Sequence, residues 1–283
     1  MTQLWCNDQW LDFEDFPISP TDRGAILGLG LFETLLALDG VPVFAARHLA
    51  RLKRGCEQLG WQLTLPDFQE TARELLTRNH LASGRARVRL AISGGTGSIN
   101  DLTAGSDAVV SMVALRVGEI PGSLTLNFSP WPRNERSPLA GLKCASYAEN
   151  VIALDRARRL GFDETVFFNS SGQLCEAATA NIFLVKDGSI LTPSLESGCL
   201  PGITREVVIE LAEKRGIPCQ ERVLTAADLQ AADELFVTAS IRGLMGVSRL
   251  EERIFPAGAI TSILRESWNE VALQSTQFGD AFF

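Results

Sequence analysis

The apolar positions in the first part of the chain predict a hairpin and then a helix. Residues 31–38, LFETLLAL, and residues 41–44, VPVF, are apolar runs separated by Asp39-Gly40. This dipeptide is typical of tight hairpin turns, because both of its residues tolerate a positive φ. The segment after the hairpin has apolar residues at helical spacing, which are Leu49, Leu52, Cys56 and Leu59. Gly60 then predicts the end of the helix.

Further elements follow in alternation. Residues 65–81 read as a second helix with Pro66 near its first turn. Residues 85–93, RARVRLAIS, and 107–115, DAVVSMVAL, read as strands. Beyond them, the sequence predicts a helix over about 146–160, where Ser146 and Glu149 fit a capping box. Short strands are expected around Phe167, Phe183 and Leu191, then a helix after "PGIT", a strand at "ELFVTAS" and a C-terminal helix.

This order of elements indicates a mixed α/β protein with two domains. Residues 116–123 and 129–141 are rich in proline, glycine or charge and lack periodicity, so the boundary is expected there. We therefore predict a small N-terminal domain over 1–118, a linker region over 119–141 and a larger C-terminal domain over 142–283. A chain of 283 residues is long enough for two cores.

Composition narrows the class of protein. The chain is 46% hydrophobic and 21% charged, which is typical of a globular protein, and no apolar run reaches the roughly 18 residues of a membrane span. The N-terminal segment carries acids where a secretory signal carries bases, so a cytoplasmic protein is expected. The net charge of −8 and the lack of a Lys/Arg run argue against nucleic acid as a partner, whereas a local arginine cluster could still bind a small anion.

Cysteine and histidine do not indicate a metal site or a disulfide framework. The six cysteines form no C-x-x-C pair, and the two histidines, His48 and His80, are far apart in sequence. We expect no metal, and we expect the cysteines to be small buried apolar residues.

Two scarce residue types stand close together in "GLKCASYAENV". The chain has only four lysines, one of them Lys143, and its single tyrosine is Tyr147. The predicted capping box places Lys143 on an extended segment and Tyr147 in the first turn of a helix. A lysine among apolar neighbours is partly desolvated, which lowers its pKa and makes its amine a usable nucleophile. The alternative is a lysine whose amine simply reaches solvent.

Four other features are compatible with a ligand site, and each also has a structural explanation. Glu176 lies in a small, apolar stretch and needs a partner, which could be an arginine or a heterocycle nitrogen. The helix that begins at Ile203-Thr204 offers backbone N–H groups that bind anions. Arg51 is either a surface residue or an anion ligand. Small hydroxyl residues end the strand at "FVTAS", as they would beside a phosphate.

Taken together, these pieces resemble the fold type IV pyridoxal-phosphate enzymes, the class IV aminotransferase family. The family includes branched-chain aminotransferases, D-amino-acid aminotransferases and 4-amino-4-deoxychorismate lyases. The matching stretches cover nearly the whole chain, and they are DRGAILGLGLFET, HLARL, KCASYAENVIALDRARRLGFDE, GQLCEAATANIF, LTPSLESGCLPGITR and FVTASIRGLMGV.

The resemblance implies a role for each matching residue. Lys143 would form the internal aldimine with pyridoxal 5'-phosphate and shuttle the substrate's α-proton. Glu176 would hold the pyridine nitrogen protonated, Tyr147 would bind the ring oxygen, and the phosphate would be bound by Arg51, Ile203, Thr204 and Ser240. Substrate carboxylates would contact Arg89 or Arg242, with Phe32 and Thr34 as walls. The family fold also implies a homodimer, with the cofactor between two domains and the active site at the dimer interface.

The sequence is compatible with more than one reaction. "TASIRGLMGV" and the spacing from Lys143 to Tyr147 resemble the lyases, which release pyruvate from aminodeoxychorismate and give 4-aminobenzoate for folate biosynthesis. Transamination of branched-chain amino acids, D-amino acids or (R)-amines is the alternative, and a non-catalytic binding protein is a remote one. The chain departs from the family pattern at positions that border the substrate: Leu29, "KCAS", Gly94 and Ala239.

Overall fold

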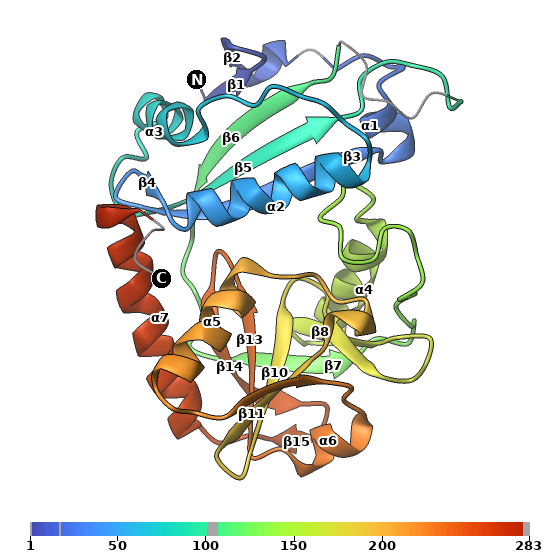
Figure 1. The fold of residues 1–283 in the computed structure, drawn as a ribbon, viewed down its shortest axis with the longest axis vertical. Helices are drawn as coiled ribbons and strands as arrows, with labels where there is room; N and C mark the ends of the chain where they lie inside the picture. The colour runs from blue at the N-terminus through green and yellow to red at the C-terminus, as the bar shows by residue number, and fades with distance from the viewer. Residues whose placement is uncertain (1, 17, 101–106, 280–283) are drawn as a thin grey trace. The chain divides into compact units, whose positions relative to one another are not determined.

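The fold is mixed α/β, as predicted, with two sheets and helices packed against them (Figure 1). A computed structural model describes residues 2–16, 18–100 and 107–279. These residues divide into two compact units. The first draws on residues 1–118, 142–147 and 272–283, and the second on residues 119–141 and 148–271.

The first unit is built on a six-stranded sheet in the order β2-β1-β6-β5-β3-β4. Its neighbouring strands run antiparallel. Its elements are β1 (Gln3–Cys6), β2 (Gln9–Asp12), a 3₁₀ turn (Phe13–Asp15), α1 (Arg23–Leu27), β3 (Gly30–Leu38), β4 (Val41–Pro42), α2 (Ala45–Gln58), α3 (Phe68–Arg78), β5 (Arg85–Ser93) and β6 (Val110–Arg116).

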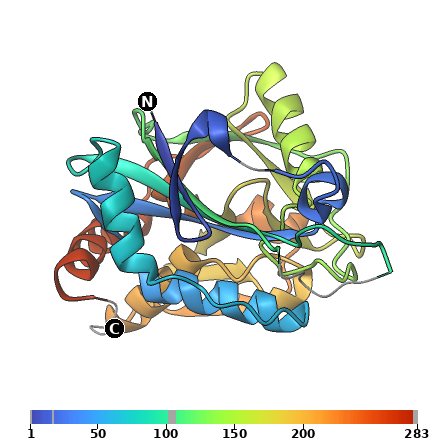
Figure 2. The same cartoon turned by 90° about the horizontal axis from the view of Figure 1, so that it is seen from above.

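The hairpin and both helices predicted in this unit are present. Asp39 and Gly40 have φ values of 46° and 81°, as a tight hairpin turn between β3 and β4 requires. The helix predicted over 65–81 is shorter, because the Asp67 side chain accepts a hydrogen bond from the Glu70 N–H and caps α3 there. Helices α2 and α3 cover one face of the sheet (Figures 1 and 2), where alternate β5 residues join their apolar side chains in one core.

The second unit contains a nine-stranded mixed sheet in the order β12-β11-β10-β13-β14-β7-β8-β9, with β15 paired to β14. Its elements are β7 (Leu124–Phe128), α4 (Ala148–Arg159), β8 (Glu164–Phe168), β9 (Leu174–Ala177), β10 (Asn181–Lys186), β11 (Ser189–Pro193), a 3₁₀ turn (Leu195–Ser197), α5 (Ile203–Lys214), β12 (Cys219–Arg222), α6 (Ala226–Ala231), β13 (Glu234–Ala239), β14 (Gly243–Leu250) and β15 (Arg253–Ile254). The last helix, α7 (Ala259–Phe278), belongs to the second unit up to residue 271 and to the first unit from residue 272.

Two local predictions differ from the structure. Residues 124–128, inside the stretch predicted as a linker, form the buried strand β7, whose apolar Leu124 and Leu126 belong to the core of the second unit. Helix α4 begins at Ala148, so Tyr147 precedes the helix rather than lying in its first turn. The reason is local: the Tyr147 N–H bonds to the Ala145 carbonyl at 2.7 Å, and the Ser146 hydroxyl donates to the carbonyl of Gly28.

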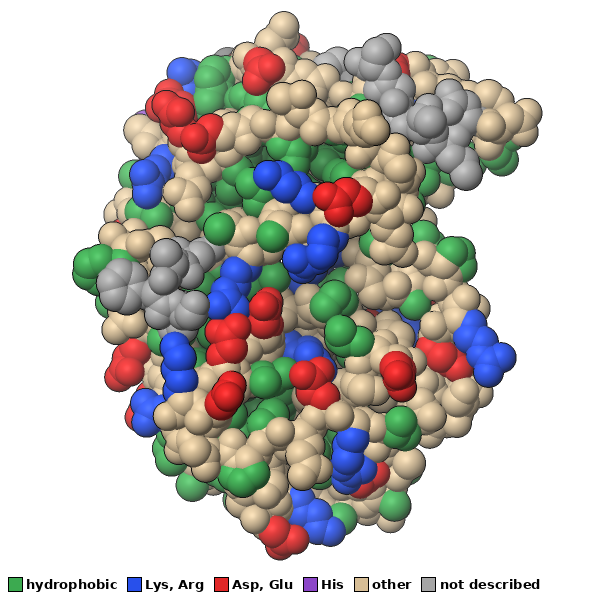
Figure 3. Space-filling model, viewed as in Figure 1, with side chains coloured by type: hydrophobic (Ala, Val, Ile, Leu, Met, Phe, Trp, Pro, Cys, Tyr) green, Lys and Arg blue, Asp and Glu red, His purple; other side chains and the backbone are tan. Residues whose placement is uncertain are grey.

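Five of the six cysteines are buried, as predicted, and Cys219 is half-buried. Acidic and basic side chains are interspersed over the face in Figure 3, in keeping with a modest net charge of −8. None of the helices in the described part of the chain is both long and apolar enough to span a membrane.

Candidate active site

Lys143 lies on a short extended segment that pairs with the edge of β3. The Phe32 N–H donates to the Lys143 carbonyl at 2.9 Å, and the Ala145 N–H donates to the Gly30 carbonyl at 2.8 Å. Gly30 permits this approach, because a Cβ there would lie 3.2 Å from the Cβ of Ala145 and 2.8 Å from the Ile92 carbonyl oxygen. The backbone of Lys143 is therefore held by strand β3 of the first unit, and its side chain is half-buried.

The ring of Phe32 is the common neighbour of three predicted site residues. Lys143 Nζ lies 4.6 Å from the ring centroid, and Arg89 Cζ lies 3.8 Å from it. The Tyr147 ring meets the Phe32 ring edge to face, with centroids 5.6 Å apart. Cations are attracted to the face of an aromatic ring. Phe32 thus gathers the reactive amine, a guanidinium and the single phenol of the chain.

Arg89 belongs to a row of arginines on one face of β5. Successive residues of a strand alternate between its faces, so Arg85, Arg87 and Arg89 share the face opposite the core residues Val88 and Leu90. Arg89 is exposed overall, but partial desolvation of its guanidinium lowers its pKa, and the charge of Arg87 lowers it further while Tyr147 raises it. Thr34, a predicted wall residue, is the cross-strand partner of Arg89.

Arg51 is held by a buried carboxylate that our sequence reasoning did not single out. Glu33 Oε1 accepts a hydrogen bond from Arg51 Nε at 2.8 Å, and Glu33 Oε2 accepts one from Arg51 Nη2 at 2.6 Å. His48 Nδ1 lies 2.7 Å from the same Oε2. The signal was available: Glu33 lies within an apolar strand and needs a partner, and His48 and Arg51 share a helix face at i, i+3.

This buried group has a defined charge state at neutral pH. Burial by itself raises the pKa of Glu33, but the charge of Arg51 and the contacts with His48 and Arg51 outweigh it and lower the pKa to about 2. Burial lowers the pKa of His48, and the charges of Arg51 and Lys143 lower it further. The carboxylate of Glu33 raises it, but by less. Glu33 is therefore ionised and His48 neutral, which requires His48 Nδ1 to carry the proton it shares with Glu33.

Glu176 lies in the second unit on β9, between the buried residues Cys175 and Ala177. Its Oε2 accepts a hydrogen bond from the Leu200 N–H at 3.0 Å, and its Oε1 lies 3.7 Å from Arg133 Nη2. Arg133 stacks on the Phe167 ring at 4.4 Å and donates to Glu149 at 2.8 Å. The sequence suggested an arginine as one possible partner of Glu176 but could not identify Arg133, which lies in the predicted linker.

The start of helix α5 has the chemistry expected of an anion site. Ile203 and Thr204 are buried, and the N-cap residue is Gly202, which has no side chain with which to cap the helix. Backbone N–H groups in a first turn need an acceptor, and phosphate oxygens supply one. A Cβ on Gly202 would lie only 2.1 Å from Asn181 Oδ1. Ser240 is half-buried in the turn directly after β13.

Arg242, the other predicted carboxylate ligand, is bound by polar groups of the second unit. Its Nη2 donates to Thr179 Oγ1 at 2.6 Å and to Glu164 Oε2 at 3.1 Å. Glu164 is fully buried, so the charge of Arg242 compensates a carboxylate that would otherwise be costly. A substrate that binds Arg242 must therefore accept hydrogen bonds from the guanidinium N–H groups that Glu164 and Thr179 do not occupy.

The residues present fit pyridoxal phosphate. In the first unit the fitting groups are a half-buried lysine, a phenol and a buried arginine. In the second unit, taken by itself, they are a carboxylate and a helix start without a side-chain cap. These are the groups that a Schiff-base lysine, a pyridine nitrogen and a phosphate require. Leu29 and Gly94, two departures from the family pattern, are in contact: the Gly94 N–H donates to the Leu29 carbonyl, and a Cβ on Gly94 would lie 3.3 Å from Leu29 Cδ2.

Comparisons of the sequence and of the structure with known proteins point to one family. Residues 30–250 match the family described as amino-transferase class IV. A probable branched-chain-amino-acid aminotransferase of Thermotoga maritima is 31% identical, over 93% of this chain and 91% of the relative. The aminodeoxychorismate lyase of Bacillus subtilis is 29% identical, over 93% and 92%. The branched-chain aminotransferase of Thermoproteus uzoniensis, solved with norvaline, superposes with a TM-score of 0.88 at 25% identity, over 98% and 97% of the two chains.

Proposed function

Because the chain belongs to the class IV aminotransferase family, whose members are pyridoxal-phosphate enzymes, we propose that it is a 4-amino-4-deoxychorismate lyase. The reaction releases pyruvate and leaves 4-aminobenzoate, a folate precursor. The proposal draws on the likeness of Thr238–Val247 to the lyase pattern and on the similarity to the Bacillus subtilis lyase. It also draws on the charge of one sheet face, which carries the argument.

The carrying observation is the pair Arg87 and Arg89 on one face of β5, where Arg89, like Lys143, lies over the ring of Phe32 from the neighbouring strand β3. The two guanidinium groups are close enough for the charge of Arg87 to lower the pKa of Arg89. Aminodeoxychorismate has two carboxylates and a ring, so two arginines and an aromatic side chain match it. A branched-chain amino acid has one carboxylate and an aliphatic side chain, for which this face is more cationic than needed.

The roles proposed for the cofactor-binding residues follow their chemistry. Lys143 attaches the cofactor covalently, and its amine then accepts and returns the substrate's proton. Glu176 would keep the pyridine nitrogen protonated, and the cofactor, when bound, would supply an electron sink. Tyr147 donates a hydrogen bond to the ring oxygen. The phosphate is bound by Arg51, the amides of Ile203 and Thr204, and Ser240.

The roles proposed for the substrate-binding residues are orientation and exclusion of water. Arg89, with Arg87 beside it, binds carboxylate, and Arg242 offers the donors that Glu164 and Thr179 leave. Phe32 and Thr34 form walls. By the same family resemblance, we propose that two copies of the chain form a homodimer in the cytoplasm; size-exclusion chromatography with light scattering tests the dimer.

Transamination is a second candidate, and it is favoured by the relatives named as branched-chain aminotransferases. It would use the same lysine, phenol and carboxylate. The two candidates differ in what they need from a second substrate, because a transaminase needs a keto acid to complete its cycle and the lyase does not.

Two assays on the purified holoenzyme distinguish the candidates. One measures pyruvate and 4-aminobenzoate released from aminodeoxychorismate, and the other measures amino transfer from L-branched-chain amino acids, D-alanine or (R)-amines to a keto acid. We expect lyase activity without added keto acid. Activity that depends strictly on a keto acid, with no 4-aminobenzoate formed, would overturn the lyase proposal in favour of the transaminase.

Variants test the residues. Borohydride should fix the cofactor to Lys143, and Lys143→Ala should lose both this attachment and turnover. Arg89→Gln should raise KM for aminodeoxychorismate about 10- to 100-fold, because a hydrogen bond to a charged group is lost. Arg54→Gln, an exposed residue on α2, is the matched control and should leave KM unchanged. An unchanged KM in Arg89→Gln would remove Arg89 from the substrate site.

A further inference from the structure

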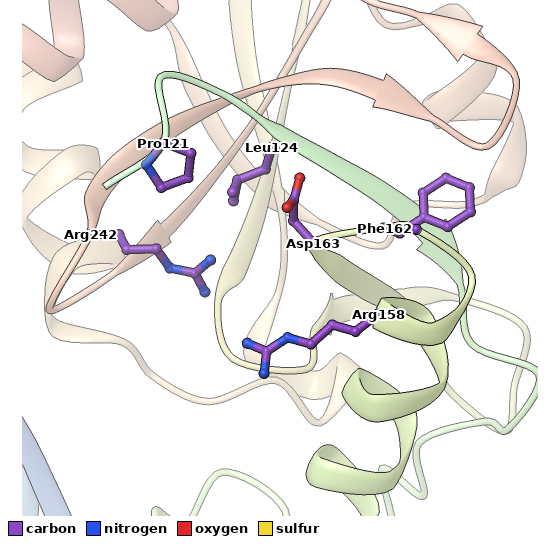
Figure 4. Close-up of a pocket in the computed structure, with 7 residues that line it drawn as sticks. Pro121, Leu124, Arg158, Phe162, Asp163 and Arg242 are labelled. Carbon is purple, nitrogen blue, oxygen red and sulfur yellow. The ribbon is translucent and has the colours of Figure 1, made fainter. Parts of the chain in front are cut away.

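The second unit contains a hollow of about 490 Å³ that includes none of the residues proposed to bind the cofactor. Of its lining residues, the proposed function uses only Arg242, as a possible ligand of a substrate carboxylate. The end of α4, the start of β7 and the turn between β13 and β14 line it. Its lining combines apolar walls with two arginines and one acid (Figure 4), and the residues are Pro121, Leu124, Arg158, Gly161, Phe162, Asp163 and Arg242.

Two guanidinium groups from different elements converge on this hollow. Arg158 comes from the last turn of α4, and Arg242 comes from the turn that precedes β14. In Figure 4 the two side chains point toward one another. The exposed Arg158 side chain makes no hydrogen bond or ion pair with any residue that the structure describes. Like charges that face each other are unfavourable unless an anion lies between them.

The acids near the hollow are already bound by other groups. Asp163 turns toward β7, where its Oδ2 accepts hydrogen bonds from the N–H of Thr125 at 2.7 Å and from the Thr125 hydroxyl at 2.8 Å. Glu164 is fully buried and binds Arg242 and Thr179. Arg249 adds a further cation at 4.7 Å from the ring centroid of Phe162. Among the residues that line the hollow, two arginines thus face one carboxylate, which leaves one positive charge in excess.

From this arrangement we propose that the hollow is a binding site for a small free oxyanion of the phosphate type, separate from the cofactor's phosphate site. Arg158 would bind the anion through its planar fork, and Arg242 would contribute the donors that Glu164 and Thr179 do not use. Pro121, Leu124 and Phe162 add apolar walls beside the two guanidinium groups. The inference holds whether the enzyme is a lyase or a transaminase.

The test uses the holoenzyme, so that the cofactor already occupies its own phosphate site. The melting temperature is measured against inorganic phosphate concentration at constant ionic strength, with chloride as the balancing ion. A ligand that binds the folded state raises the melting temperature saturably. Phosphate also stabilises proteins by exclusion from their surface, but that effect is shared by all variants and does not saturate.

Three variants make the test specific. Arg158→Gln should weaken phosphate binding about tenfold or more, whereas Arg158→Lys, which keeps the charge but not the fork, should weaken it less. Arg159→Gln is the matched control, because Arg159 lies on the same helix, pairs with Asp155 at 2.8 Å and does not line the hollow. Its phosphate response should equal that of the wild type.

Two results would overturn the proposal. One is a phosphate response that is identical in wild type and Arg158→Gln, which would mean that Arg158 binds no anion. The other is inhibition by phosphate that is competitive with substrate, which would assign the hollow to the substrate's own carboxylate. Noncompetitive or absent inhibition, together with a saturable response lost in Arg158→Gln, supports a separate site.

Discussion

The carboxylate of Glu33 accepts two hydrogen bonds from the guanidinium of Arg51, and both side chains are buried. A planar fork bound at two atoms has one orientation, so Glu33 determines where the remaining donors of Arg51 point. His48 holds the other side of the same carboxylate. The residue expected to bind the cofactor's phosphate is therefore positioned by two residues that do not themselves bind it.

Removing this carboxylate should be costly. Glu33→Gln leaves Arg51 as a buried cation without its counter-charge, and we expect the free energy of unfolding to fall by about 3–5 kcal/mol, with weaker retention of the cofactor. Urea denaturation of the apoenzyme and a cofactor titration measure the two effects. The control is Glu74→Gln, which removes an exposed ion pair with Arg78 and should cost less than about 1 kcal/mol. Equal costs would mean that the Glu33 pair is not buried in solution.

The same group predicts an acid-sensitive fold. The pKa of His48 is lowered in the folded state, so the unfolded chain binds the proton more readily, and stability should begin to fall as the pH drops below 6.5. The pKa of Glu33 is lowered from 4.5 to about 2, so its contribution is complete above pH 4.5 and is lost as the pH falls toward 2. Unfolding free energies measured from pH 7.5 to 4 should decline, and His48→Asn should flatten the part between pH 6.5 and 5.

Tyr147 can be tested without disturbing the packing around Phe32. Tyr147→Phe keeps the edge-to-face contact with Phe32 and removes only the hydroxyl. We expect stability within about 0.5 kcal/mol of the wild type. We expect cofactor binding to persist, with turnover reduced about 10- to 100-fold, because one hydrogen bond to the cofactor's ring oxygen is lost. The pH dependence of the cofactor's absorbance should also shift. Wild-type turnover and spectrum in this variant would exclude the phenol from the site.

Gly202 is predicted to tolerate no side chain. Its φ of −72° is open to any residue, so the obstacle is steric: a Cβ would overlap Asn181 Oδ1. Asn181 is buried and donates to the Leu200 carbonyl at 2.8 Å, and the Leu200 N–H donates to Glu176. Gly202→Ala should therefore cost about 1–3 kcal/mol and weaken cofactor binding. Gly122→Ala, where no atom lies within 4 Å, is the control and should be neutral by thermal melting.

Much of the fold was predictable because its signals are local. The turn at Asp39-Gly40, the helical spacing from Leu49 to Leu59 and the alternation of β5 all depend on neighbours along the chain. Local signals failed where a distant contact competed with them. Ser146 reads as a helix cap in isolation, but its hydroxyl bonds to Gly28, 118 residues away, and Tyr147 stays outside α4.

By itself the sequence determined the family and the cofactor and predicted the residues of the site, because each depends on chemistry and spacing within short motifs. Only the tertiary structure decided which partners these residues have. Strand alternation indicates which face a side chain occupies, but not what lies opposite it. The register of β3 and the packing of α2 place Arg51 on Glu33, and the path of residues 129–141 places Arg133 beside Glu176. Such pairings join residues distant in sequence, and they form only when burial forces each charge to find a partner.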